Sequence, residues 1–470
     1  MMRHIYCIAA FAFFVAGGSA SAAPADHTEV VKMILHPMPA TQPALSHSLL
    51  PRAIDQSPGN AATLYMIAAR KVPDYSKKDV YAKIDDLEDL NLEDLRKKDK
   101  EAQEVLDQFS TSLEYVDLGA RREEAQWDAG LRDLGARAMV SYLNDMRLLQ
   151  NVLCVQYRLQ LSRGDFNGAE RSLQSAMAME RQLSDRPLLI QGLVQCGFVE
   201  LAMHHGIAEW VSQPGAPNLY WALTALPTPI VQRLPVAQWE QLENIVSGLD
   251  TSKPVESLSR QQANAAFTHA LTVIRASQRP GKMEPIEKQI NDLRHANVER
   301  GRQFLELHGF AKQAVQSMPD DQVVSLFFLL QFRIFYDDVW KCIELPYWQA
   351  ASQLAQIDKA FKTEAAEPSP NPLVLATHST LRIYYVFERS DWDVAQMRTI
   401  EAIRDYAARH GGTAPAALDQ ISDLPLPIDP FTGKPFEYRV QGKDAVLECP
   451  LPSLFRSGGR RFELSFEKPK

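Results

Sequence analysis

Two pairs of adjacent acidic residues are the first candidates for acid–base chemistry in this sequence. They are Asp320 with Asp321 and Asp337 with Asp338. Glycoside hydrolases use two carboxyl groups that flank the bond to be cleaved. Both pairs lie in segments with a helical pattern, where helix capping or solvent exposure also accounts for them. Polysaccharide hydrolysis by carboxylates that only the fold brings together is therefore kept as an alternative function.

Histidines and cysteines show no spacing that is typical of a metal site or a catalytic motif. His204 and His205 are adjacent, and the sequence has no HExxH, GxSxG, Walker or CxxC motif. We therefore expect no metal and no cofactor. Cysteines in apolar helical stretches usually belong to the core. In an oxidising compartment the four cysteines outside the first 22 residues allow three disulfide pairings, which their spacing does not distinguish: Cys154, Cys196, Cys342 and Cys449.

The loop from Gln213 to Pro235 contains the candidate binding residues Asn218, Tyr220 and Trp221. Aromatic side chains near helix ends can line a groove for a peptide or a glycan. The alternative is a structural role, in which Trp221 holds the loop against the neighbouring helices.

Composition limits the class of protein. The chain has 470 residues, 46% of them hydrophobic, and a formal net charge of −8. These values are typical of a globular protein with one large or two to three ordinary domains. A nucleic-acid partner is not expected, because it would need a basic face. The longest apolar run after residue 22, Val323 to Phe335, is interrupted by polar residues and indicates a buried helix rather than a transmembrane segment.

The first 22 residues have the pattern of a secretory signal peptide. Arg3 and His4 precede an apolar run from Ile5 to Val15, and Ala20-Ser21-Ala22 supplies small residues for cleavage. The apolar run is too short to span a bilayer. We expect the mature chain to begin near Ala23 and to work in the periplasm or outside the cell.

Three regions follow the signal peptide: a Pro- and Ala-rich lead-in at 23–60, a helical domain at 61–393 and a C-terminal element at 394–470. Val30 to Leu35 is predicted as a short element of the lead-in. Acids and then bases crowd residues 79–109, which indicates a solvated helix face rather than a metal site. Periodicity and breakers predict helices at 61–70, 79–109 with a division near Asn91, most of 113–211, 219–226, 236–249, 258–277, 284–316, 320–344, 347–363 and 371–389.

A single helical hairpin stands out in the predicted domain. An apolar stripe from Leu148 to Leu159 is followed by Gly164-Asp165-Phe166, and a second helix begins near Ala169. This pattern resembles one tetratricopeptide repeat. We predict a mostly α fold: an irregular superhelix of such helical hairpins, similar to tetratricopeptide repeats, with a small C-terminal α+β element.

The C-terminal element has a different pattern. Residues 394–410 predict an amphipathic helix that Gly411-Gly412 ends. Phe436 to Val440 and Ala445 to Glu448 predict a β-hairpin, and Arg461 to Phe466 predicts a third strand.

Two resemblances accompany these patterns. Segment 398–450 is similar to the soluble part of a type II secretion major pseudopilin, through Tyr406, Gly411-Gly412, Pro415, Leu418 and Asp429-Pro430. The chain lacks the N-terminal helix by which such pilins polymerise, so assembly into a pilus is not implied. The mature chain also resembles large secreted helical proteins of planctomycete-type bacteria, which implies the fold and export but no activity. That resemblance is carried by Gly164-Asp165-Phe166, Leu189 to Leu193, Pro214 to Leu223 and Asp429-Pro430.

The sequence thus predicts a secreted or cell-envelope helical-repeat protein that serves as a binding scaffold or adaptor for another protein. The competing hypothesis is an α-helical envelope hydrolase that acts on a polysaccharide.

Overall fold

The structure is a computed structural model that describes residues 27–73, 78–127, 142–183, 189–232, 248, 254–276, 285–452 and 457–467. These residues are mostly helical, with a small sheet, which confirms the predicted fold class. The predicted signal peptide lies outside the described residues, and so does the predicted helix at 236–249 except for Gly248. Within the described residues, no helix combines the length and the apolar character needed to cross a membrane.

The first helices begin and end close to the residues that the sequence predicts. Asn60 caps α2, and Asn91 caps α4 by accepting a hydrogen bond from the Asp94 amide. The predicted helix at 79–109 divides at Asn91 and once more at Lys98. The helices of this region are α2 (Ala61–Arg70), α3 (Lys78–Glu88), α4 (Leu92–Lys97), α5 (Asp99–Gln108) and α6 (Ser110–Ala120).

Helices α8 (Tyr142–Ser162) and α9 (Phe166–Arg181) form the predicted hairpin. Gly164 makes the turn with a φ of +74°, a conformation that glycine adopts without strain. Asp165 then caps α9 by accepting a hydrogen bond from the Gly168 amide at 3.0 Å. The Phe166 ring packs on Trp210, with 5.2 Å between ring centroids. The arrangement of further hairpins as an irregular tetratricopeptide-like superhelix stays a prediction.

Adjacent histidines mark a change of helix type. Helix α10 (Leu189–Leu201) continues through a π-helical turn at Ala202–Ile207 into α11 (Ala208–Val211). A Cβ atom on Gly206 would approach the Leu173 side chain to 2.6 Å, so this turn needs glycine to pack against α9. The short helix α12 (Tyr220–Thr224) follows, and the Asn218 side chain before it accepts a hydrogen bond from the Tyr220 amide.

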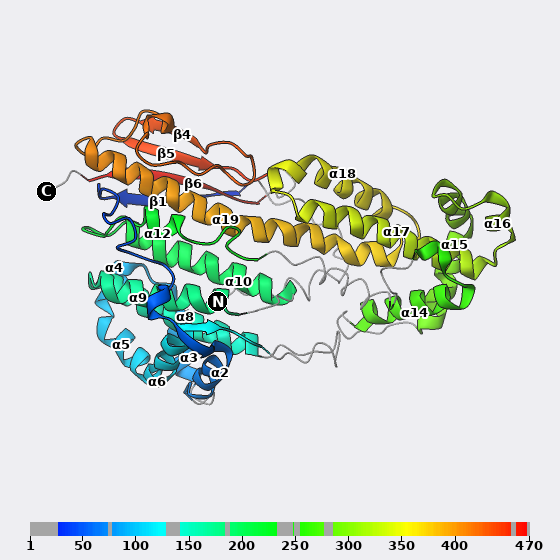
Figure 1. Cartoon of the computed structure of the whole chain (residues 1–470), viewed down its shortest axis with the longest axis horizontal. Helices are drawn as coiled ribbons and strands as arrows, with labels where there is room; N and C mark the ends of the chain where they lie inside the picture. The colour runs from blue at the N-terminus through cyan, green and yellow to red at the C-terminus, as the bar shows by residue number, and fades with distance from the viewer. Residues whose placement is uncertain are drawn as a thin grey trace.

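The second half of the chain begins with helices that lie at one end of the elongated molecule (Figure 1). The predicted helix at 284–316 is two helices, because Gly309 takes a φ of +92° between them. These helices are α14 (Arg260–Ala276), α15 (Ile286–Leu307), α16 (Lys312–Ser317), α17 (Asp320–Ile343) and α18 (Tyr347–Ala365).

Helix α19 (Pro372–Arg409) runs from these helices to the sheet at the other end of the molecule (Figure 1). The two helices predicted at 371–389 and 394–410 are therefore one continuous helix. No glycine or proline occurs between Leu373 and Arg409, and Trp392 and Asp393 at the expected break are both buried. At 1.5 Å per residue, its 38 residues extend roughly 57 Å.

A four-stranded sheet with the order β1-β6-β5-β4 covers the C-terminal half of α19. Strands β4 (Glu437–Gln441) and β5 (Asp444–Cys449) form the predicted hairpin, and β6 (Ser457–Phe466) is the predicted third strand. Strand β1 (His27–Leu35), from the lead-in, pairs in parallel with β6. The remaining elements are β2 (Ser57–Asn60), which pairs with β3 (Arg122–Glu124), and three short 3₁₀ helices at Ala53–Asp55, Val255–Ser257 and Leu418–Gln420.

Candidate binding groove

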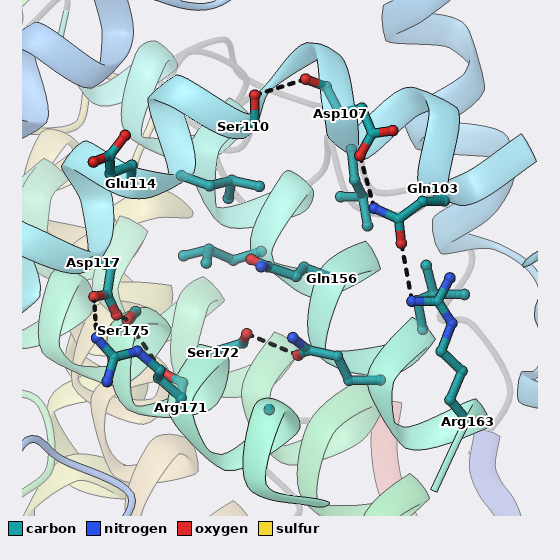
Figure 2. A pocket seen from close by; sticks show the side chains of 16 residues that line it. Gln103, Asp107, Ser110, Glu114, Asp117, Gln156, Arg163, Arg171, Ser172 and Ser175 are labelled. Atoms are coloured by element: carbon teal, nitrogen blue, oxygen red, sulfur yellow. Dashed lines mark hydrogen bonds and ion pairs between the residues drawn. The ribbon is translucent and has the colours of Figure 1, made fainter. Parts of the chain in front are cut away.

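A polar groove of about 400 Å³ lies between helices α5 and α6 on one side and α8 and α9 on the other (Figure 2). This volume falls in the range of pockets that bind small ligands or peptide side chains. The α8–α9 hairpin supplies one wall, and the helices before it supply the other. The groove is lined by Gln103, Leu106, Asp107, Ser110, Leu113, Glu114, Asp117, Leu153, Gln156, Leu159, Gln160, Arg163, Gly168, Arg171, Ser172 and Ser175.

One end of the groove is fixed by Arg163, at the start of the α8–α9 turn. Its Nε donates to Asp99 Oδ1 at 2.5 Å, and its Nη1 donates to Gln103 Oε1 at 2.9 Å. Gln103 in turn donates to Asp107 Oδ1 at 2.8 Å (Figure 2). The hydrogen bond from Arg163 lowers the pKa of the Asp99 carboxyl group. These contacts join α5 to the end of α8.

The other end is fixed by Asp117 on α6. Its carboxylate pairs with Arg171 at 2.6 Å and with Arg121 at 2.5 Å, and it accepts a hydrogen bond from Ser175 Oγ at 3.1 Å. Both ends of the groove are therefore held by ion pairs between the two walls, so that the space between them is formed before any ligand arrives.

The middle of the groove combines polar groups that lack partners with an apolar surface. Within the described part of the chain, no hydrogen bond or ion pair engages the side chains of Glu114 or Gln156. Gln156 lies between the two end clusters in Figure 2, and Glu114 lies on the same side as Asp117. Four leucines contribute the apolar part: Leu113 is half-buried, and Leu106, Leu153 and Leu159 are buried beneath the groove. Such a surface suits a ligand with both aliphatic and polar groups.

The binding residues predicted from the sequence lie elsewhere. Asn218 and Tyr220 are buried, and Trp221 is half-buried. The Asn218 side chain donates to the carbonyls of Met38 and Glu401, and its oxygen accepts the Tyr220 amide. The Tyr220 hydroxyl donates to a backbone carbonyl, and the Trp221 ring packs edge-on against the Tyr220 ring. These contacts join the loop to α19 and to the chain that follows β1.

The acid pairs from the sequence are not brought together. Asp320 pairs with Arg302 at 2.7 Å, and Asp321 pairs with Arg260 at 3.0 Å at the start of α17. Asp337 and Asp338 both pair with Lys341 on the surface of that helix, at 2.5 and 3.4 Å. The polar groove contains none of these four residues.

The four cysteines of the described residues are buried, and none of them is part of a disulfide. Desolvation raises the pKa of Cys342 to about 11 and moves the pKa of Cys154 and Cys449 further above the usual value. A thiol must be deprotonated to act as a nucleophile, so these cysteines suit the core, as their apolar context predicts.

The π-helical turn directs His204 and His205 to different partners. His204 Nε2 lies 3.9 Å from Asp393 Oδ1 on α19, and His205 Nδ1 lies 3.8 Å from Glu209 Oε1 on α11. Within the described residues, no three His, Cys, Asp or Glu side chains are grouped so that they could hold a metal ion.

Sequence reasoning did not select the residues of the groove. The charge-dense segment predicts a solvated helix face and the turn at Gly164 predicts a helical hairpin, so neither pattern indicates a groove. The available signal was that Ser110, Glu114 and Asp117 recur at helical spacing, opposite Gln156 and Gln160 on another helix. Comparison with family models, with curated proteins and with solved structures finds no match to this chain.

Proposed function

We propose that this protein is an exported helical protein of the cell envelope that binds another protein, and that the polar groove receives a segment of that partner. The preformed groove carries the proposal, because ion pairs hold its ends while, among the described residues, nothing hydrogen-bonds or ion-pairs with the side chains of the exposed Glu114 and the half-buried Gln156. A segment of a partner can bury side chains on the leucines and satisfy these polar groups. Preorganised sites avoid the ordering cost that a flexible site must meet on binding.

Filling the groove tests this function. Gln156→Trp places an indole in the middle of the groove, and Gln356→Trp makes the same change at an exposed position of α18. Partners captured from an envelope extract by the wild-type protein are identified by mass spectrometry and then purified. We expect a true partner to lose binding to Gln156→Trp and to keep it with Gln356→Trp. Equal binding to both variants contradicts a role for the groove.

Export is tested separately. The full-length chain is expressed with a C-terminal tag, and its mass and cell fraction are measured. Cleavage before Ala23 and recovery outside the cytoplasm support the proposal. An uncleaved chain in the cytoplasm contradicts it.

A polysaccharide hydrolase is the second candidate, because three carboxylates line the same groove: Asp107, Glu114 and Asp117. Glycoside cleavage needs two carboxyl groups that face one bond. Asp117 is held by two arginines and a serine, which favours a structural role for that carboxylate. Release of reducing sugars from a cell-wall polysaccharide, abolished by Glu114→Gln, would support the hydrolase over the binding protein.

A further inference from the structure

We propose that the groove recognises a segment that carries a lysine or arginine beside apolar residues, and that Glu114 selects the cationic side chain. This inference rests on the binding function proposed above and names the chemistry of the partner.

The charges of the groove favour a cation. Three acids and two bases line it, and both bases already form ion pairs. Arg163 pairs with Asp99, and Arg171 shares Asp117 with Arg121. An anionic ligand would have to compete with these carboxylates for the arginines. In contrast, Glu114 has no partner among the described residues, and Asp107 accepts only the amide of Gln103 on its carboxylate.

The apolar lining suits the stem of such a side chain. Leu113 precedes Glu114 on α6, and Leu106 precedes Asp107 on α5, so each of these acids adjoins a leucine of the groove. Lysine and arginine place their methylene groups on apolar surface while the charged end stays in contact with water or an acid. Gln156 can then donate to a carbonyl of the bound segment and accept from an amide.

The net charge of the whole chain also favours a cationic partner. A formal net charge of −8 attracts a cationic partner at long range and repels an acidic one. A basic segment is therefore favoured both during approach and at the groove itself.

The experiment selects peptides from a phage-displayed library of random 12-residue sequences on the immobilised full chain. We expect lysine or arginine to be enriched next to apolar residues. A synthetic peptide of the enriched sequence is then measured by fluorescence anisotropy at low and high salt. Glu114→Gln should weaken its binding about fivefold, as the loss of one partly exposed charge pair does. The charge reversal Glu114→Lys should enrich acidic peptides instead.

Glu104→Gln is the matched control, because it removes an exposed acid of α5 that does not line the groove. It should bind the peptide like the wild type, and both variants should melt like the wild type. If peptides are enriched but carry no basic residue, or if Glu114→Gln binds them unchanged, the inference is wrong while the groove function stands. If no peptide is enriched, or if Gln156→Trp binds as well as the wild type, both proposals fail.

Discussion

Arg158 shows how one buried side chain holds several elements of this protein together. It is almost fully buried on α8, where it forms two hydrogen bonds with the Glu209 carboxylate, at 2.8 and 2.9 Å. It also donates to the backbone carbonyls of Glu88 and Leu90, so it satisfies the end of α3. Burial opposes the charged form, but Glu209 raises the pKa of Arg158, and the guanidinium stays charged.

We expect Arg158→Met to lower the free energy of unfolding by about 3 kcal/mol, because it leaves Glu209 and the α3 carbonyls without their buried partner. Urea denaturation followed by circular dichroism measures the loss. Arg163→Met is the control, since the Arg163–Asp99 pair is partly exposed, and it should cost less than about 1 kcal/mol. If both variants lose a similar amount of unfolding free energy, burial does not determine how much each ion pair contributes to stability.

Asn218 gives a second prediction at the scale of the residue. Asn218→Ala should destabilise the protein by about 2 kcal/mol, because the buried carbonyls of Met38 and Glu401 lose their donor. Differential scanning calorimetry should show a lower melting temperature, and the phage-selected peptide should still bind. A variant that melts like the wild type and loses the peptide would instead place Asn218 in a binding surface.

At the scale of the element, the end of α3 meets the π-helical turn. Glu88, at this end of α3, is an acid with an unusual pKa. Desolvation raises the pKa of Glu88 from 4.5 to about 7, while His205 and Arg158 oppose the shift and Asp85 and Asp89 add to it. The folded state therefore binds this proton more strongly than the unfolded state does. Its contribution to stability is present below about pH 4.5 and is lost as the pH rises to about 7.

We expect Glu88→Gln to remove this dependence. Relative to the wild type, the variant should gain stability between pH 5 and pH 8, by up to about 3 kcal/mol. Thermal melting across this range provides the measurement. Glu93→Gln, at an exposed position of α4, should follow the wild type at every pH. A constant difference between Glu88→Gln and the wild type would contradict the raised pKa.

The sequence predicts the bounds of some elements more accurately than those of others. The sequence predicts helix α2 to the residue, and the order of acids and bases along residues 79–109 predicts the division near Asn91, because both depend on local signals. The join across residues 390–393 in α19 was not predicted, since a run of Ser, Asp and Trp neither breaks a helix nor extends one. Burial against neighbouring elements decides it.

At the scale of the whole molecule, contacts between distant segments were the hardest to predict. The lead-in strand at Val30 to Leu35 was predicted as an element, but nothing local specifies that it pairs in parallel with β6. The groove is equally hard to predict from the sequence, because its lining residues belong to four helices and share no motif. Amphipathic patterns identify which face of a helix is polar, and only packing shows which polar faces lie opposite one another.

Strand β1 should stabilise the sheet well beyond its own residues. Deletion of residues 27–35 leaves β6 with an open edge and removes the buried Met33 and Leu35 from the core. We expect hydrogen exchange to accelerate in β6 and β5 and to stay slow in α15 and α17, at the other end of the molecule. Unchanged protection of β6 would contradict the role assigned to the strand.

Because β1 pairs with β6, the sheet cannot be completed before the end of the chain has been synthesised. Glu29 and Arg460, which form an ion pair at 3.3 Å, are 431 residues apart, so the first strand to be synthesised must wait for the last. At about 5–20 residues per second, this delay is on the order of 20 to 90 seconds. Throughout that interval the partner strand does not yet exist, so the edge of the first strand that faces β6 in the folded protein stays without its partner until synthesis ends.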